Sequence, residues 1–129
     1  MTDIKDLDKN MPILVVDDFS TVRRVVKNCL SGLGFKNVFE AENFASAKEQ
    51  ISEQSIKFII SDFKLPDVND ESALLALLDQ HSPQPLPVLL VVNENQKKEL
   101  LSKSKVKQEQ LLVKPFTKQM LQEKIQSLI

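Results

Sequence analysis

The chain has 129 residues, 42% hydrophobic and 27% charged, with a formal net charge of -1 at pH 7. This composition is typical of one globular domain, and the near-neutral charge offers no general attraction for nucleic acid or anionic membranes. The single cysteine, Cys29, excludes an internal disulfide and a cysteine zinc cluster. No apolar run approaches the roughly 20 residues that span a bilayer, and residues 1–11 are too polar and acidic for a secretory signal. We therefore expect a cytoplasmic single domain over residues 1–129, with a flexible lead-in over residues 1–10.

The first element, residues 13–18, is an apolar run that ends in two adjacent carboxylates, Asp17 and Asp18. Four β-favouring residues without polar alternation predict a strand buried on both faces, as in the middle of a parallel sheet. Adjacent carboxylates repel each other unless a cation neutralises them. The alternative is that Asp18 merely caps the following helix while Asp17 is solvated. This stretch alone does not decide between a cation site and a cap.

Further predicted strands and helices alternate along the rest of the chain. Apolar runs predict the strands, helical spacing of apolar residues predicts the helices, and Asn43 and Thr117 are expected helix caps. Such alternation implies an α/β fold, a doubly wound five-stranded parallel sheet covered by helices on both faces. The predicted strands are 13–16, 38–41, 58–62, 88–92 and 111–113, and the predicted helices are 22–33, 44–51, 71–81, 94–104 and 118–128.

Charged residues stand at the ends of three of these strands: Asp17 and Asp18 at the first, Asp62 at the third and Lys114 at the fifth. In a right-handed doubly wound sheet of order 2-1-3-4-5, the first and third strands are neighbours. Their terminal acids would then meet in one crevice, with the lysine reaching over from the fifth strand. Oxygen ligands of this kind suit Mg²⁺, and the lysine could neutralise a phosphoryl group.

With these residues in view, the sequence resembles the response-regulator receiver family of two-component signal transduction, and most closely its CheY-like chemotaxis members. The flavodoxin-like strand order 2-1-3-4-5 is the order of that family. The resemblance implies a phosphorelay receiver that takes part in its own phosphotransfer and dephosphorylation, and is otherwise not an enzyme. The segments that carry it are residues 14–21 with Arg23 and Arg24, 60–62 with Pro66, 86–89, and 113–117.

The resemblance also implies roles for single residues. Asp62 aligns with the aspartate that accepts a phosphoryl group from a histidine kinase. Asp17 and Asp18 align with the acids that hold Mg²⁺, together with Asp62, and Lys64 occupies the position whose backbone carbonyl is a metal ligand. Lys114 aligns with the lysine that pairs first with the acceptor and then with the phosphoryl group.

Two further expectations follow from the resemblance. The Lys114–Pro115 bond should be cis. The downstream protein target should bind the face formed by the fourth helix, the fifth strand and the last helix, where Lys97 and Lys118 would contribute. No nucleic acid or membrane is expected as a partner.

The residues that transmit the signal depart from the family pattern. Val92 stands where the family normally has Thr or Ser, so the phosphoryl oxygen would lack a hydroxyl partner. Asn93 follows at a position that is normally small, and it could crowd the site. Leu111 replaces an aromatic switch residue, and Asp70 replaces a glycine. The acceptor and metal residues are thus intact while the switch positions are altered.

Three functions compete. One is a Mg²⁺-dependent receiver phosphorylated on Asp62 in chemotaxis or a related pathway. The second is a degenerate receiver, acting as a constitutive interaction module or as a phosphoryl sink with little conformational switching. The third, a flavin carrier, is disfavoured because Asp17 and Asp18 would repel a phosphate where a flavodoxin has a phosphate-binding loop.

Overall fold

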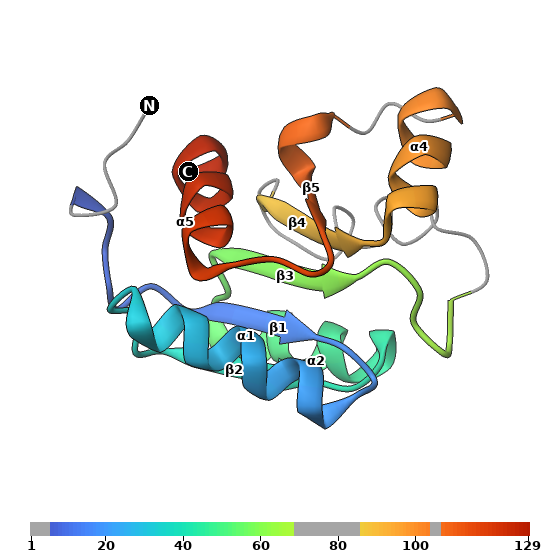
Figure 1. Cartoon of the computed structure of the whole chain (residues 1–129). Coiled ribbons are helices and arrows are strands. Elements are labelled where there is room, and N and C mark those ends of the chain that lie inside the picture. The colour runs from blue at the N-terminus through green and yellow to red at the C-terminus, as the bar shows by residue number, and fades with distance from the viewer. Residues whose placement is uncertain (1–5, 69–85, 104–106) are drawn as a thin grey trace.

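The structure, a computed structural model, describes residues 6–68, 86–103 and 107–129. It contains a five-stranded, fully parallel sheet of order β2-β1-β3-β4-β5 (Figure 1). The predicted fold class and strand order are therefore confirmed. The strands are β1 (Ile13–Val16), β2 (Val38–Ala41), β3 (Phe58–Asp62), β4 (Val88–Val92) and β5 (Leu111–Val113).

The described helices follow the strands as expected from the apolar spacing. None of them is long and apolar enough to cross a membrane. The helix predicted over residues 71–81, and Asp70 with it, lies outside the described residues. The described helices are α1 (Ser20–Gly32), α2 (Phe44–Gln54), α4 (Glu94–Lys103), the short 3-10 helix η2 (Gln108–Gln110) and α5 (Lys118–Leu128).

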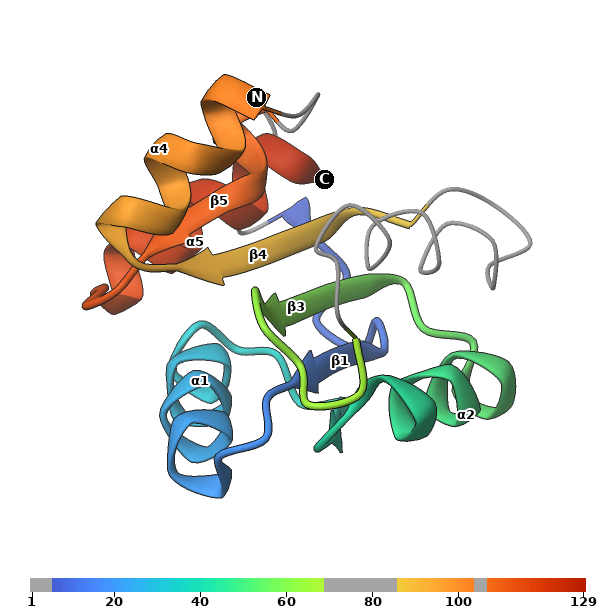
Figure 2. The ribbon, with the colours of Figure 1, turned by 90° about the vertical axis from the view of Figure 1, so that its right-hand side faces the viewer.

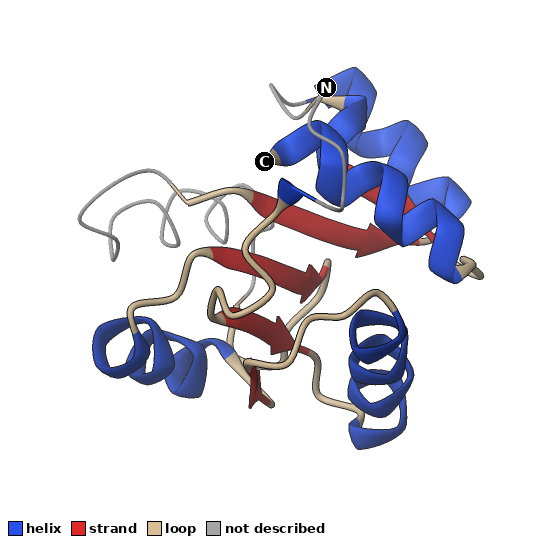
Figure 3. Cartoon of the chain, turned by 90° about the vertical axis from the view of Figure 1, so that its left-hand side faces the viewer, coloured by secondary structure: helices blue, strands red, loops and turns tan. Residues whose placement is uncertain are grey.

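The sheet has two apolar faces, because successive side chains of a strand point to opposite sides. In β1, Ile13 and Val15 face α1 and α5, whereas Leu14 and Val16 face α2 and α4. Figures 2 and 3 show α1 and α2 on opposite sides of the strands. Leu7, from the expected lead-in, is buried on the α1 and α5 side.

Local sequence sets where the helices begin and end. Asn43 caps α2, since its Oδ1 accepts a 2.8 Å hydrogen bond from the Ser46 backbone N–H. Thr117 caps α5 through a 3.1 Å bond from the Met120 N–H. Both predicted caps are confirmed. Gly34, just beyond α1, has a φ of 99°, a conformation that favours glycine.

The register of the strands positions the loops that follow them. Val16, the last residue of β1, pairs with Ala41 of β2 and with Ser61 of β3, and β3 continues to Asp62. All five strands are parallel, so their carboxyl ends share one edge of the sheet. Asp17 extends β1 by one more bond, from its N–H to the Ala41 carbonyl oxygen at 3.1 Å. The residues after β1 and β3 are therefore held side by side.

Candidate functional site

Three carboxylates meet at the carboxyl edge of the sheet. Asp17, Asp18 and Asp62 each offer an oxygen, and these oxygens all lie within 4.8 Å of one another; we call this group the acid pocket. Asp17 is buried, the Asp62 side chain is 14% exposed and Asp18 is exposed. The predicted convergence of the acids from β1 and β3 is thus realised in the folded chain, with one open side toward solvent.

Hydrogen bonds to both its side chain and its main chain hold Asp17. Its Oδ1 accepts a 2.9 Å bond from the Phe19 N–H. The Arg23 guanidinium donates to its backbone carbonyl oxygen. Arg23 is anchored in turn by a 3.0 Å ion pair from its Nε to Glu40 Oε1 on β2. Bonds from Phe19 and Arg23 therefore fix the turn from β1 to α1, and Arg23 links this turn to β2. Sequence reasoning did not anticipate the contact between Arg23 and Glu40.

The electrostatics of the pocket favour a bound cation. Burial raises the pKa of Asp17 from 3.8 to about 6, and the negative charges of Asp62 and Asp18 push it in the same direction. The Phe19 N–H and the Lys114 ammonium act against this rise. A carboxyl group whose ionised form is disfavoured, beside two more acids, gains most from an added positive charge.

Asp62 lies at the end of β3 with one oxygen already engaged. Its Oδ1 accepts a 2.9 Å hydrogen bond from the Phe63 N–H and lies 3.4 Å from Lys114 Nζ. No described residue is hydrogen-bonded to the other oxygen, Oδ2. Lys114 is set beside β4 by a 2.8 Å bond from its N–H to the Val92 carbonyl, and the expected cis Lys114–Pro115 bond is present. The lysine from β5 thus reaches the acid from β3 as predicted.

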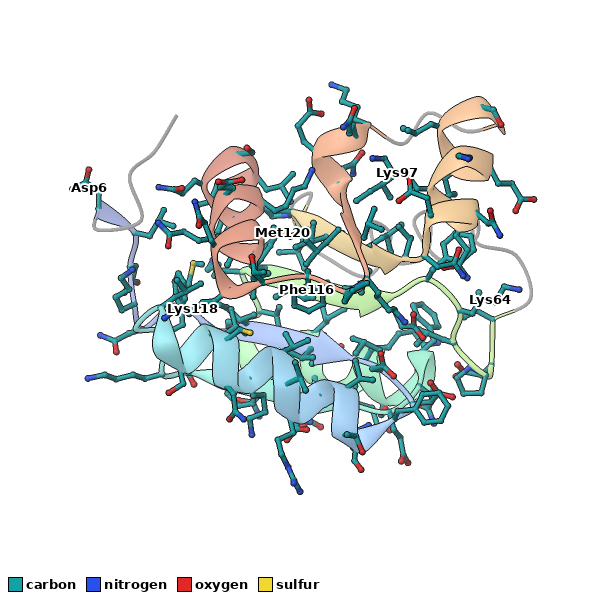
Figure 4. All side chains as sticks on the ribbon, viewed as in Figure 1. Asp6, Lys64, Lys97, Phe116, Lys118 and Met120 are labelled. Atoms are coloured by element: carbon teal, nitrogen blue, oxygen red, sulfur yellow. The ribbon has the colours of Figure 1, made fainter. Side chains whose placement is uncertain are left out.

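Lys64 follows in the loop that leaves β3. Its side chain is exposed, while its neighbours Phe63 and Leu65 are buried against the sheet. Figure 4 shows Lys64 on this loop at the carboxyl edge of the sheet. A main-chain group at this position is close in sequence to the pocket, so a backbone role for Lys64 is compatible with its placement.

Of the altered switch positions, Val92 and Asn93 lie at the carboxyl end of β4, whereas Leu111 begins β5 and pairs with Leu90. Val92 and Leu111 are fully buried in the apolar cluster that also contains Leu100 of α4. Asn93 is exposed, and its side chain caps α4: Oδ1 accepts from the Gln96 N–H and Gln96 Oε1 accepts from the Asn93 N–H, both at 2.8 Å. The Asn93 side chain therefore caps the start of α4. Sequence reasoning missed this role.

A groove of about 480 Å³ runs between α4, β5 and α5. Lys97 lines it from α4 and Met120 from α5, on either side of β5 (Figure 4). Lys118 was expected on this face as well, but its side chain lies over Gly32 at the end of α1. This part of the expectation is corrected: α5 turns Lys118 toward α1, and Lys124 occupies the groove instead.

Comparison with known proteins agrees with this geometry. Residues 13–126 match the response regulator receiver domain. The chain is 35% identical over 119 residues to the chemotaxis protein CheY-3 of Vibrio cholerae serotype O1, across 92% of each sequence. It is 36% identical over 118 residues to the chemotaxis protein CheY of Pseudomonas aeruginosa, across 92% of this chain and 95% of that protein.

Solved structures share the fold. CheY4 of Vibrio cholerae superposes with a TM-score of 0.73 at 22% identity, over 93% of this chain and 99% of that chain. A putative response regulator from Chloroflexus aurantiacus superposes with a TM-score of 0.75 at 25% identity, over 92% of this chain and 97% of that chain. The family match covers every described strand and the whole acid pocket, and the chain therefore belongs to the response-regulator receiver family.

Proposed function

We propose that this protein is a two-component receiver that accepts a phosphoryl group on Asp62 from a histidine kinase, with Mg²⁺ as cofactor, in cytoplasmic chemotaxis signalling or a related pathway. The observation that carries the proposal is the convergence of three carboxylates with the Lys114 ammonium at one edge of the sheet. This combination provides an acceptor, ligands for a cation and a fixed positive charge within one small site.

The donor set fits Mg²⁺, because that ion prefers hard oxygen ligands and commonly keeps several waters beside one or two carboxylates. Asp17, Asp18 and Asp62 would hold it, together with the backbone carbonyl of Lys64. When bound, the cation offsets negative charge on the acids and on an incoming phosphoryl group.

The chain's own residues prepare Asp62 for attack. The Phe63 N–H and Lys114 both contact Oδ1, which leaves Oδ2 as the oxygen that attacks phosphorus. In that step an O–P bond forms to Oδ2 while the bond from phosphorus to the donor group breaks. Lys114 then balances charge on the transferred group, since its ammonium lies beside the acceptor from the outset.

A second candidate function rests on Val92 and Leu111. Both are buried and neither carries a hydroxyl or an aromatic ring, so the phosphoryl group would gain no hydrogen bond from β4. The protein would then act as a phosphoryl sink or as a constitutive interaction module, with little conformational switching. The two candidates differ in output rather than in the acceptor site.

The experiment that tests acceptance is incubation with acetyl phosphate, with and without Mg²⁺, followed by intact-mass measurement. The wild type should gain one phosphoryl mass only when Mg²⁺ is present, and Asp62→Asn should gain none. Asp8→Asn, an exposed acid outside the pocket, is the matched control and should label normally. Equal labelling without Mg²⁺, or labelling of Asp62→Asn, would contradict the proposal.

We also propose that the downstream target binds the groove between α4, β5 and α5. Apolar Met120 lies among three lysines and two glutamates in the lining, and this small excess of positive charge suits a partner segment that combines apolar with some acidic side chains. Lys97→Glu should weaken the complex with the target without lowering stability, whereas Lys36→Glu, an exposed lysine between α1 and β2, should not. Loss of binding from substitutions on α1 alone would contradict this assignment.

A further inference from the structure

Asp67 makes an unusual contact in the loop that follows β3. Its Oδ1 accepts a 2.8 Å hydrogen bond from the Phe44 N–H, and its Oδ2 accepts a 2.9 Å bond from the Ala45 N–H. These are the first two residues of α2, whose N–H groups have no partner within the helix. Burial works toward a higher pKa for Asp67, but these hydrogen bonds outweigh it and lower the pKa. The ionised carboxylate thus binds the positive end of the helix.

The contact is more than a helix cap, because α2 already has its own. Asn43 accepts from the Ser46 N–H, and the Ser46 hydroxyl oxygen accepts from the Asn43 N–H. Asp67 comes from a segment 23 residues away in sequence from Phe44. It therefore joins two separate parts of the fold, the start of α2 and the loop that leaves the phosphoacceptor strand.

This loop is attached at several points on either side of Lys64. The Phe63 N–H donates to the Val91 carbonyl at 3.1 Å, which ties the loop to β4. Phe63 and Leu65 are buried in the same apolar cluster as Phe44 of α2. Asp67 adds a polar link at the far end. Lys64 lies between these attachments with an exposed side chain (Figure 4), so its backbone is constrained from both directions.

We infer that Asp67 is a positioning residue, which ties the loop over residues 63–68 to α2 and thereby sets the Lys64 backbone against the acid pocket. This inference rests on the proposed function, since the Lys64 carbonyl matters only if the pocket holds a cation. Removing a residue that holds a metal ligand in place, without itself touching the metal, commonly lowers metal affinity by about tenfold or more.

The test compares Asp67→Ala with Asn43→Ala. Both variants remove hydrogen bonds from the start of α2, but only Asp67→Ala cuts the link to the loop. The first measurement is amide hydrogen exchange at Phe63 and Val68 in metal-free protein, and the second is Mg²⁺ affinity by titration calorimetry. Asp67→Ala should speed exchange in the loop and weaken Mg²⁺ binding by about tenfold. Asn43→Ala should change both by less than about twofold, while Asp67→Asn, which keeps one acceptor oxygen, should lie between.

Each outcome decides the inference. Equal losses in Asp67→Ala and Asn43→Ala would mean that fraying of α2 causes the effect, and would overturn it. Unchanged exchange in the loop of Asp67→Ala would overturn it as well. If the wild type bound no Mg²⁺, the proposed cation site would fail and the role of Asp67 toward it would fail too. In that case loop exchange in metal-free protein would still show whether Asp67 tethers the loop.

Discussion

The two halves of the carboxyl edge carry different chemistry. Around β1 and β3 the residues are charged, and hydrogen bonds from Phe19, Arg23 and Phe63 hold the acids in place. In the other half, Val92 at the end of β4 and Leu111 at the start of β5 are apolar and buried. The first half is arranged to receive a charged group, whereas the second half offers that group the Lys114 ammonium but no side-chain hydroxyl.

This difference separates acceptance of a phosphoryl group from transmission of a signal. Acceptance needs ligands and compensating charge, which the acid pocket and Lys114 provide. Transmission needs an interaction that differs in free energy between two conformations. The Val92 side chain cannot form a hydrogen bond, and the Asn93 side chain is already engaged with Gln96. Substitutions in the two halves should therefore affect acceptance and transmission separately.

The largest effect is expected from Asp17→Asn in the absence of metal. Because the pKa of Asp17 is raised from 3.8 to about 6, its ionisation destabilises the fold as pH rises from about 4 to above 6. The loss amounts to at most about 3 kcal/mol. Asp17→Asn should therefore unfold at higher urea concentration than the wild type at pH 7.5, with the difference shrinking toward pH 4, and should bind Mg²⁺ more weakly. A variant less stable than the wild type at pH 7.5 would show that ionisation of Asp17 does not destabilise the fold.

Val92→Thr should supply a side-chain hydroxyl at the end of β4, where the wild type has none. A hydrogen bond to a charged group is worth about 1.5–3 kcal/mol, which shifts a two-state equilibrium by about ten- to a hundredfold. Amide NMR shifts across residues 88–92 and 111–113 on adding beryllofluoride should be small in the wild type and larger in this variant.

Two further variants locate the cause of that response. Val92→Ala, which adds no hydroxyl, should behave like the wild type. The Val92→Thr, Asn93→Ala double variant tests whether Asn93 limits access. Large concerted shifts in the wild type would show that the chain switches by another route.

Asn93→Ala alone should destabilise α4 by about 1 kcal/mol, the usual loss for removing a helix cap. Its reciprocal bonds with Gln96 are the reason. Urea unfolding measures the loss, and exposed Asn95→Ala in the same turn is the control. If both variants lost the same stability, the cap would contribute nothing beyond helix propensity.

Glu40→Gln should have the smallest effect, at most about 1 kcal/mol, because exposed ion pairs are weak and screened by salt. Burial tends to raise the pKa of Glu40, yet its bonds with Lys27 and Arg23 lower it. The ion pairs of Glu40 with Arg23 and Lys27 therefore stabilise the fold at neutral pH, and this stabilisation is lost as pH falls through the lowered pKa of Glu40. Unfolding at low and high salt, with exposed Glu42→Gln as control, should show the difference only at low salt.

Much of the fold and the site could be predicted, because the relevant signals are local. An uncharged β-favouring run such as residues 13–16 predicts a buried strand wherever it stands. Parallel strands end at one edge, so the acids after β1 and β3 had to meet once the strand order was known. The caps Asn43 and Thr117 act within four residues of themselves, and their side chains were sufficient to place two helix starts.

Contacts between distant segments could be decided only by the tertiary structure. Arg23 of α1 reaches Glu40 of β2 across 17 residues of sequence, and Asp67 reaches α2 across 23 residues. Lys118 turns toward Gly32, against the prediction for that residue. Residue type and spacing alone set strands, caps and the strand ends that bear acids. The hydrogen bonds of Arg23 and Asp67 depend on how the helices pack on the sheet. This packing decides which side chains come within about 3 Å of each other, the distance at which a hydrogen bond forms.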